Sequence, residues 1–120
     1  MLLTVYGISN CDKVKTIRSW LQENNINYKF HDYKKHGCDE ILVKNILIQF
    51  NFREVINTRG TTWRKLPDTI KNSLNDKKAA YLMRDNPSII KRPILEFNGQ
   101  WILGLDTNTL VKMLEYHPHA

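Results

Sequence analysis

Residues 2–15, LLTVYGISNCDKVK, contain the elements that decide the fold. The apolar run Leu2–Tyr6 predicts a buried strand, and Gly7–Asn10 predicts a tight turn that can end at a helix N-cap. A helix is expected from about Cys11 to Glu23, because apolar residues recur there at helical spacing: Cys11, Val14, Ile17 and Leu21. The stretch is therefore typical of a strand, a turn and a helix in direct succession.

The next elements extend this unit. Apolar residues alternate with polar ones over 26–31, which predicts a second strand and completes a strand-helix-strand unit with parallel strands. Two apolar runs, 94–97 and 101–103, flank Asn98-Gly99, the strongest short signal for a β-hairpin. A last helix is expected from Asp106, a good N-cap residue, to about Tyr116.

The middle of the chain, roughly residues 33–85, has a helical pattern instead. Asp39-Glu40 opens a stretch with apolar residues four positions apart, 57–62 is a loop, and 68–74 and 76–83 predict two short helices. No repeat or linker interrupts the chain, so we expect one domain over 1–120. This order is similar to the thioredoxin plan, an α/β fold with a mixed four-stranded sheet, here carrying an all-helical insertion.

Composition limits the class of protein. With 120 residues, 42% of them apolar, the chain can bury a core for one domain, and no apolar run approaches the roughly 18 residues of a membrane span. Two cysteines suit a reducing compartment, so we expect a cytoplasmic protein. The net charge of +6 favours anionic partners, but the basic residues are scattered, which does not favour nucleic acid.

Cys11 is the candidate nucleophile. It follows a strand and a tight turn, where unpaired backbone N–H groups and the positive end of a helix favour a thiolate. Lys13, Lys15 and Arg18 add positive potential nearby, which water screens for any side chain that points away. The alternative is an ordinary buried core cysteine. Val14 stands where a C-x-x-C pair has its second cysteine, which excludes a dithiol at this helix start.

Cys38 is the other thiol, at the boundary of the expected insertion. It reads better as an incidental exposed or half-buried thiol than as a resolving cysteine. Oxidised Cys11 is then expected to be resolved by glutathione or by a partner protein.

Two arginines in loops are candidates for binding an anion. Arg59 precedes Gly60, Arg92 precedes Pro93, and a guanidinium in a loop can grip an anion with two hydrogen bonds. The alternative is a pair of solvated surface arginines. We predict a cis bond between Arg92 and Pro93, because an Arg-Pro step just before a strand suits that isomer.

Other residues with chemical potential are assigned no site. The histidines lack partners at metal-ligand spacing, so no metal is assigned to His31, His36, His117 or His119. The tryptophans are expected to be packing residues: Trp20, Trp63 and Trp101.

Four separated blocks resemble one family. They are YGISNCDKVK at 6–15, HDY at 31–33, NTRGTTWRK at 57–65 and NPSIIKRP at 86–93. In this order they are similar to the arsenate reductase and Spx family, and more narrowly to its YffB-like branch. The resemblance runs from one end of the chain to the other.

This resemblance implies a cytosolic thioredoxin-like fold with Cys11 as the catalytic nucleophile. It implies anion binding by the arginines at 59 and 92, and we assign the anion or substrate site to Asn10, Lys13, Lys15, Arg59, Arg92 and Pro93. No bound cofactor is expected. Glutathione is the implied co-substrate, glutathione or a glutaredoxin-like protein is the implied reductant, and we expect a monomer.

The sequence departs from the family pattern at one place. Arsenate reductases of this family hold the oxyanion with three arginines, and here Gly104-Leu105-Asp106 stands where the third is expected. Losing one charge-assisted grip weakens oxyanion binding roughly ten- to a hundredfold. We therefore expect a glutathione-dependent thiol reductase that reduces arsenate poorly. The alternative is an Spx-like protein that binds RNA polymerase without the redox dithiol.

Overall fold

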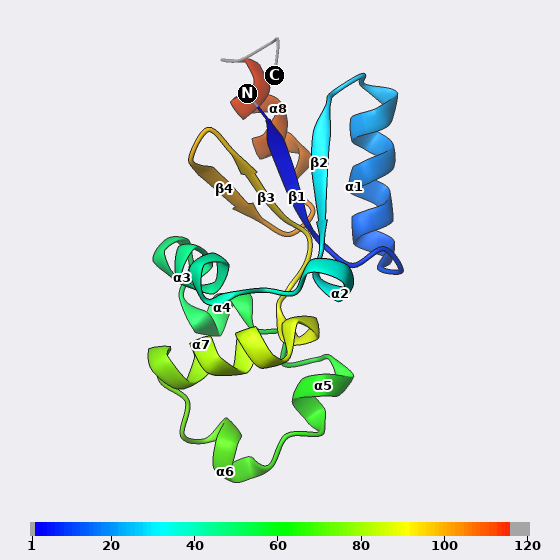
Figure 1. Ribbon diagram of the computed structural model, residues 1–120. Helices are drawn as coiled ribbons and strands as arrows, with labels where there is room; N and C mark the ends of the chain where they lie inside the picture. The colour runs from blue at the N-terminus through cyan, green and yellow to red at the C-terminus, as the bar shows by residue number, and fades with distance from the viewer. Residues whose placement is uncertain (1, 116–120) are drawn as a thin grey trace. The chain divides into compact units, whose positions relative to one another are not determined.

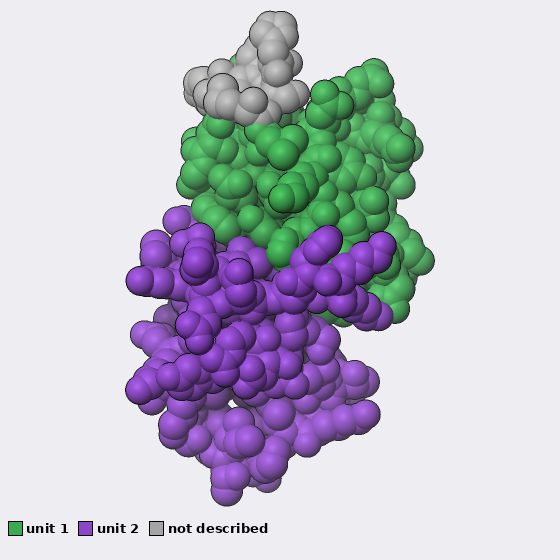
Figure 2. All heavy atoms as spheres, viewed as in Figure 1, with its two compact units in different colours: residues 1–32, 92–120 green, residues 33–91 purple. Residues whose placement is uncertain are grey.

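The computed structural model describes residues 2–115 (Figure 1). Its contacts divide the chain into two compact units, coloured in Figure 2. The sheet unit contains residues 1–32 and 92–120, and the helical unit contains residues 33–91, so the helical unit is inserted in the chain between two strands of the sheet. Each unit is described by itself.

The sheet unit contains a mixed four-stranded sheet, as the sequence predicts. Its strands are β1 (Leu3–Gly7), β2 (Tyr28–Asp32), β3 (Ile94–Phe97) and β4 (Gln100–Leu103), in the spatial order β2-β1-β3-β4. β1 pairs with β2 in parallel and with β3 antiparallel, and β3 pairs antiparallel with β4. The fold is the thioredoxin-like α/β arrangement expected from the order of elements.

Two helices, α1 (Asp12–Glu23) and α8 (Thr107–Glu115), share one core with the sheet. Val5 pairs with Leu95 and Leu95 with Ile102, so these side chains point to one face of the sheet. The helices pack on that face, and the buried core consists of Leu3, Val5, Ile17, Leu21, Leu95, Phe97, Ile102, Leu110 and Met113. Burial of this apolar set holds the strand, turn and helix around Cys11 in place.

The predicted hairpin is confirmed. Asn98 and Gly99 connect β3 to β4 with φ values of 52° and 77°. Two consecutive positive φ values are those of a type I′ turn, whose twist matches that of the strands.

The helical unit consists of short helices. They are α2 (Tyr33–His36), α3 (Glu40–Gln49), α4 (Phe52–Val55), α5 (Thr61–Arg64), α6 (Asp68–Lys71), α7 (Asp76–Asp85) and the 3-10 helix η1 (Pro87–Ile89). Asp39, Asn51 and Asn75 cap α3, α4 and α7 by accepting backbone N–H groups. The end of the unit is tied to its middle, because Lys91 N–H donates to Val55 O at 2.7 Å and Ile56 bridges Ile90.

Some predicted boundaries are wrong. The second strand starts at Tyr28 rather than 26, because the N–H of Ile26 is bonded to Leu21 O at the end of α1. The helix expected over 68–74 is one turn long, and the loop expected over 57–62 already contains the start of α5. The single-turn helices α2 and α4 were not predicted, because one turn shows no helical periodicity. The end of the last helix at Tyr116 lies outside the described residues, as do His117 and His119.

The helical unit extends to Lys91, beyond the expected insert end near 85, since η1 and the strand-like Ile90 pack within it. Whether both units fold together as one domain stays a prediction. Among residues 2–115, none of the helices is long and apolar enough to cross a membrane.

Candidate functional site

Cys11 is the N-cap residue of α1. Its backbone is extended (φ −100°, ψ 128°), its C=O accepts the N–H of Lys15 at 2.9 Å, and its side chain is half-buried. It is therefore not a buried core residue, in contrast to Val14, Ile17 and Leu21 further along the helix. No side chain caps this helix start. The backbone N–H groups of the first turn are thus left to face the sulfur or an anion beside it.

The cations near this helix start divide into two kinds. Lys13 and Lys15 are exposed and so add a potential that salt screens. Arg18 is held against β2 instead: its Nε donates to the Tyr28 hydroxyl at 3.0 Å and its guanidinium lies 4.1 Å from the Phe30 ring centroid. Arg18 therefore serves packing between α1 and the sheet. Asn10 is exposed in the turn that precedes Cys11.

Gly7 ends β1 at a crowded point that the sequence does not reveal. A Cβ atom placed on Gly7 meets Val14 Cγ2 at 2.7 Å and Arg92 Cβ at 3.7 Å. The first turn of α1 and Arg92, two residues before β3, therefore both lie close to the end of β1. Val14, fully buried, fills the position that a resolving cysteine would need. In the sequence, the only sign of this crowding is a glycine at the end of a strand, and a glycine does not reveal which side chains lie close to it.

The bond between Arg92 and Pro93 is cis, as predicted. Pro93 is buried, and its C=O accepts the N–H of Gly104 at 2.8 Å. Gly104 has a φ of +87°, which favours glycine. The loop that follows β4 is thereby fixed beside Pro93, at the same end of the sheet as Gly7.

That loop is where the third arginine of the arsenate reductases is expected. Leu105 is 41% exposed and is not one of the residues of the buried core. Asp106 caps α8: Oδ1 accepts the Thr109 N–H at 3.0 Å and Oδ2 accepts the Thr109 hydroxyl at 2.7 Å. These two hydrogen bonds hold the pKa of the Asp106 carboxyl below its usual value, and the bond from the Thr109 N–H has the larger effect. Both oxygens of the carboxylate are therefore used by the helix.

Arg59 belongs to the helical unit and is exposed. Its loop has a defined shape, because the Arg59 N–H donates to Asn57 Oδ1 at 3.0 Å and Gly60 caps α5. The guanidinium is therefore presented from an ordered turn. That it converges with Arg92 on Cys11 stays a prediction.

Cys38 is buried, with 3% of its surface exposed, so the expectation of an exposed or half-buried thiol is wrong. Burial, and to a smaller extent the Asp39 carboxylate, raises the pKa of the Cys38 thiol to about 12. At neutral pH it is protonated and a poor nucleophile. The two thiols thus differ in exposure: Cys11 is half-buried and Cys38 is buried.

No group of three or more His, Cys, Asp or Glu residues suited to a metal ion occurs within residues 2–115. The assignment of no metal therefore stays a prediction from the sequence.

The comparisons with known proteins agree with the fold. The model of the ArsC family matches residues 6–118. A solved structure described as YFFB (PA3664) protein has a TM-score of 0.87 at 38% identity, covering 92% of this chain and 96% of its own. An arsenate reductase (ArsC) related protein from Brucella melitensis has a TM-score of 0.75 at 37% identity, covering 100% and 97%.

A global transcriptional regulator, Spx of Staphylococcus aureus, is 27% identical over 94% of this chain and 87% of its own. Relatives of this chain thus include both an arsenate-reductase-related protein and a regulator. Because the family model covers nearly the whole chain and the fold agrees from end to end, the chain belongs to the ArsC family.

Proposed function

We propose that this protein is a glutathione-dependent thiol reductase, an oxidoreductase that uses Cys11 as its nucleophile. The observation that carries the proposal is the contrast between the two thiols. Cys11 lies half-buried at a helix start that no side chain caps, whereas Cys38 is buried and protonated at neutral pH. Cys11 is therefore the thiol available for attack. Helix α1 contains no second cysteine that could resolve a disulfide formed on Cys11.

The chemistry has two thiol-disulfide exchanges. The Cys11 thiolate attacks the glutathionyl sulfur of a mixed disulfide, forming a Cys11–glutathione disulfide and releasing the substrate thiolate, which takes a proton from water. A second glutathione, as thiolate, attacks the glutathionyl sulfur of that adduct. Glutathione disulfide leaves, and the Cys11 thiolate is restored. The net reaction converts the mixed disulfide and one reduced glutathione into the free substrate thiol and glutathione disulfide.

The charged residues support binding of an anionic substrate. The Cβ atom of Arg92 lies beside Gly7. Pro93 and the start of α1 are at this same end of the sheet. A guanidinium there suits a glutathione carboxylate, and Arg59 is proposed to add a second grip. Because Gly104-Leu105-Asp106 stands where the third arginine is expected, arsenate is proposed to be a poor substrate.

The test is the mass of the intact protein after incubation with oxidised glutathione at neutral pH. We expect one added glutathione on wild type and on the matched variant Cys38→Ser, and none on Cys11→Ser. Peptide mapping should place the adduct on Cys11. In a coupled assay with a glutathionylated peptide, Cys38→Ser should turn over like wild type and Cys11→Ser should be inactive.

A loss of two protons without added glutathione, from a Cys11–Cys38 disulfide, contradicts the proposed role of glutathione. Val14→Cys provides a positive control for internal resolution. It places a second thiol one turn after Cys11, where side chains of a helix meet. In this variant, the thiol at position 14 should displace glutathione from Cys11 and form an internal disulfide.

A second candidate function is favoured by the similarity to Spx: a protein that binds RNA polymerase without a redox dithiol. One pair of experiments distinguishes the two functions. Capture of purified polymerase subunits by Cys11→Ser as well as by wild type, together with no glutathione adduct on wild type, would favour the binding role.

A further inference from the structure

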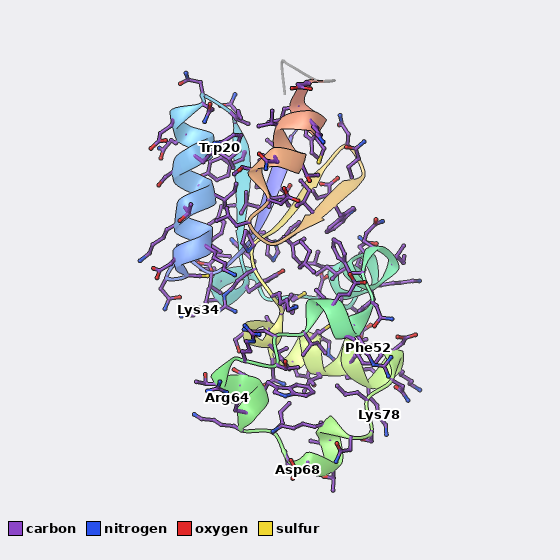
Figure 3. All side chains as sticks on the ribbon, turned by 180° about the vertical axis from the view of Figure 1, so that it is seen from behind. Trp20, Lys34, Phe52, Arg64, Asp68 and Lys78 are labelled. Atoms are coloured by element: carbon purple, nitrogen blue, oxygen red, sulfur yellow. The ribbon has the colours of Figure 1, made fainter. Side chains whose placement is uncertain are left out.

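A pocket lies wholly within the helical unit, among α4, α5 and α6. Its volume is about 250 Å³, and its lining comprises Phe52, Arg53, Ile56, Thr58, Trp63, Lys71, Asn72 and Leu74. Figure 3 labels Phe52 on α4, with Arg64 on α5 and Asp68 on α6. Phe52 and Ile56 are buried, whereas Trp63 is half-buried, so the ring of Trp63 forms a wall of a pocket rather than only filling the core. The expectation that it is a packing residue thus describes it incompletely.

Cations are fixed against the aromatic walls of this pocket. Lys71 Nζ lies 5.9 Å from the Trp63 ring centroid and donates a hydrogen bond to Arg64 O at 3.3 Å. An ammonium has three donors, so this bond leaves Lys71 with hydrogen-bonding capacity toward the pocket. The Arg53 guanidinium lies 4.9 Å from the Phe52 ring centroid. Aromatic rings, rather than carboxylates, thus lie beside the charged groups of Lys71 and Arg53.

The charge of the lining distinguishes this pocket from the larger groove between α3 and α7. That groove, of about 450 Å³, has the carboxylates of Glu40 and Asp76 among its lining residues, and Glu40 is paired with Arg84 at 2.9 Å. None of the described residues that line the smaller pocket is acidic. The smaller pocket therefore combines an apolar aromatic interior with uncompensated positive charge.

The surrounding unit has the same sign. The helical unit contains twelve of the eighteen Lys and Arg residues but six of the twelve Asp and Glu residues, so it carries the whole formal charge of +6. Such a field attracts small anions to pockets on this unit.

We propose that the pocket lined by Trp63 and Lys71 binds a planar aromatic ring that carries an anionic group. The ring lies against Phe52 and Trp63, and the phosphate or carboxylate meets Lys71 and Arg53. Pockets for drug-sized ligands measure roughly 300–1,000 Å³, so this smaller pocket suits one ring system with its substituent. The proposal uses none of the residues assigned to the Cys11 site, so it stands or falls independently of the thiol reductase proposal.

The test follows the indole N–H signals of the three tryptophans in the NMR spectrum of the ¹⁵N-labelled full chain. Four probes are titrated at low salt: adenosine 5′-monophosphate, indole-3-acetate, adenosine and inorganic phosphate. We expect saturable shifts of the Trp63 signal with at least one of the first two, while Trp20 and Trp101, which belong to the sheet unit, do not move. Which of the two anionic probes binds tells whether phosphate or carboxylate is the preferred anion.

Adenosine and phosphate alone should bind at least tenfold more weakly, because each lacks one half of the recognised group. In the variant Lys71→Met, affinity for the anionic probe should fall roughly ten- to a hundredfold, the value of one charge-assisted hydrogen bond. Lys71→Arg should retain most of it. Lys77→Met removes the same charge from α7, outside this pocket, and should bind like wild type.

The proposal is overturned if no anionic aromatic probe shifts Trp63 at millimolar concentration. It is equally overturned if adenosine or phosphate alone binds as tightly as the anionic aromatic probes, or if Lys77→Met weakens binding as much as Lys71→Met does.

Discussion

Gly7 and Val14 illustrate how single side chains shape the site. The absence of a Cβ atom at Gly7 leaves the space that Val14 occupies, 2.7 Å from where that atom would lie. Val14 is fully buried and β-branched, so it has little freedom to move aside. The start of α1, and with it Cys11, is thus seated on the end of β1 by a contact between two small residues.

Gly7→Ala should lower the free energy of unfolding by about 1–3 kcal/mol, the usual cost of overpacking a core. Urea denaturation followed by circular dichroism measures this change. The matched double variant Gly7→Ala/Val14→Ala makes room for the new methyl group. Its loss should be smaller than the sum of the two single losses by about 0.5–3 kcal/mol. Simple additivity would show that the new methyl group does not collide with Val14.

Leu105 is a second position at which a single residue is proposed to matter for the chemistry. Leu105 is 41% exposed in the loop fixed to Pro93, so we expect a longer polar residue to be tolerated there. Leu105→Arg introduces a cation in the segment where the resemblance to arsenate reductases leads us to expect a third arginine. It should raise kcat/KM for arsenate, with glutathione and glutaredoxin, roughly ten- to a hundredfold, the value of one charge-assisted hydrogen bond.

Leu105→Gln is the neutral control and should leave kcat/KM for arsenate unchanged. Efficient arsenate reduction by wild type, or an equal gain in the Gln variant, would show that the missing arginine does not limit this reaction.

At the scale of elements, α8 depends on a titratable cap. Asp106 accepts both the N–H and the hydroxyl of Thr109, and its pKa lies below the usual carboxyl value. A carboxyl whose pKa falls on folding contributes stability at pH values above its unfolded pKa. That contribution is lost as the pH falls through the folded value.

The thermal midpoint of wild type should therefore fall more steeply than that of Asp106→Asn as the pH drops below about 4, the unfolded value for Asp. Asparagine also caps helices but does not titrate in this range. Differential scanning calorimetry from pH 7 to pH 2 measures both curves. Parallel curves would mean that Asp106 contributes no pH-dependent stability.

At the scale of the whole molecule, charge is unevenly distributed along the chain. The helical unit carries the formal charge of +6, and the sheet unit, which contains Cys11, is neutral in sum. Long-range attraction of an anionic disulfide to this protein therefore originates in residues other than those that perform the exchange.

The rate at which Cys11 reacts with 5,5′-dithiobis(2-nitrobenzoate), which is anionic, should fall several-fold between 0.01 M and 0.15 M salt. Over that range the Debye length shrinks from about 30 Å to about 8 Å. The neutral 2,2′-dithiodipyridine should show little change. Stopped-flow absorbance on the Cys38→Ser variant, which has a single thiol, measures both rates. Equal salt dependence of the two reagents would exclude electrostatic attraction.

The features that the sequence predicted depend on local backbone chemistry. Asn98-Gly99 adopts positive φ values in a tight hairpin, Cys11 begins a helix after a strand and a turn, and the bond before Pro93 is cis. In each case a few consecutive residues restrict the backbone to one solution. The order of strands and helices follows from their periodicity, which is why the sheet and the candidate nucleophile could be identified.

Only the tertiary structure decided what surrounds these residues. The crowding at Gly7, the burial that raises the pKa of Cys38 to about 12, and the pocket beside Trp63 depend on side chains distant in the sequence. Single-turn helices also escaped prediction, because an isolated turn is stabilised by packing rather than by its own propensity. The sequence by itself determined the type of each local element and the identity of its candidate nucleophile. The environment of each side chain was set by long-range packing, which no local pattern encodes.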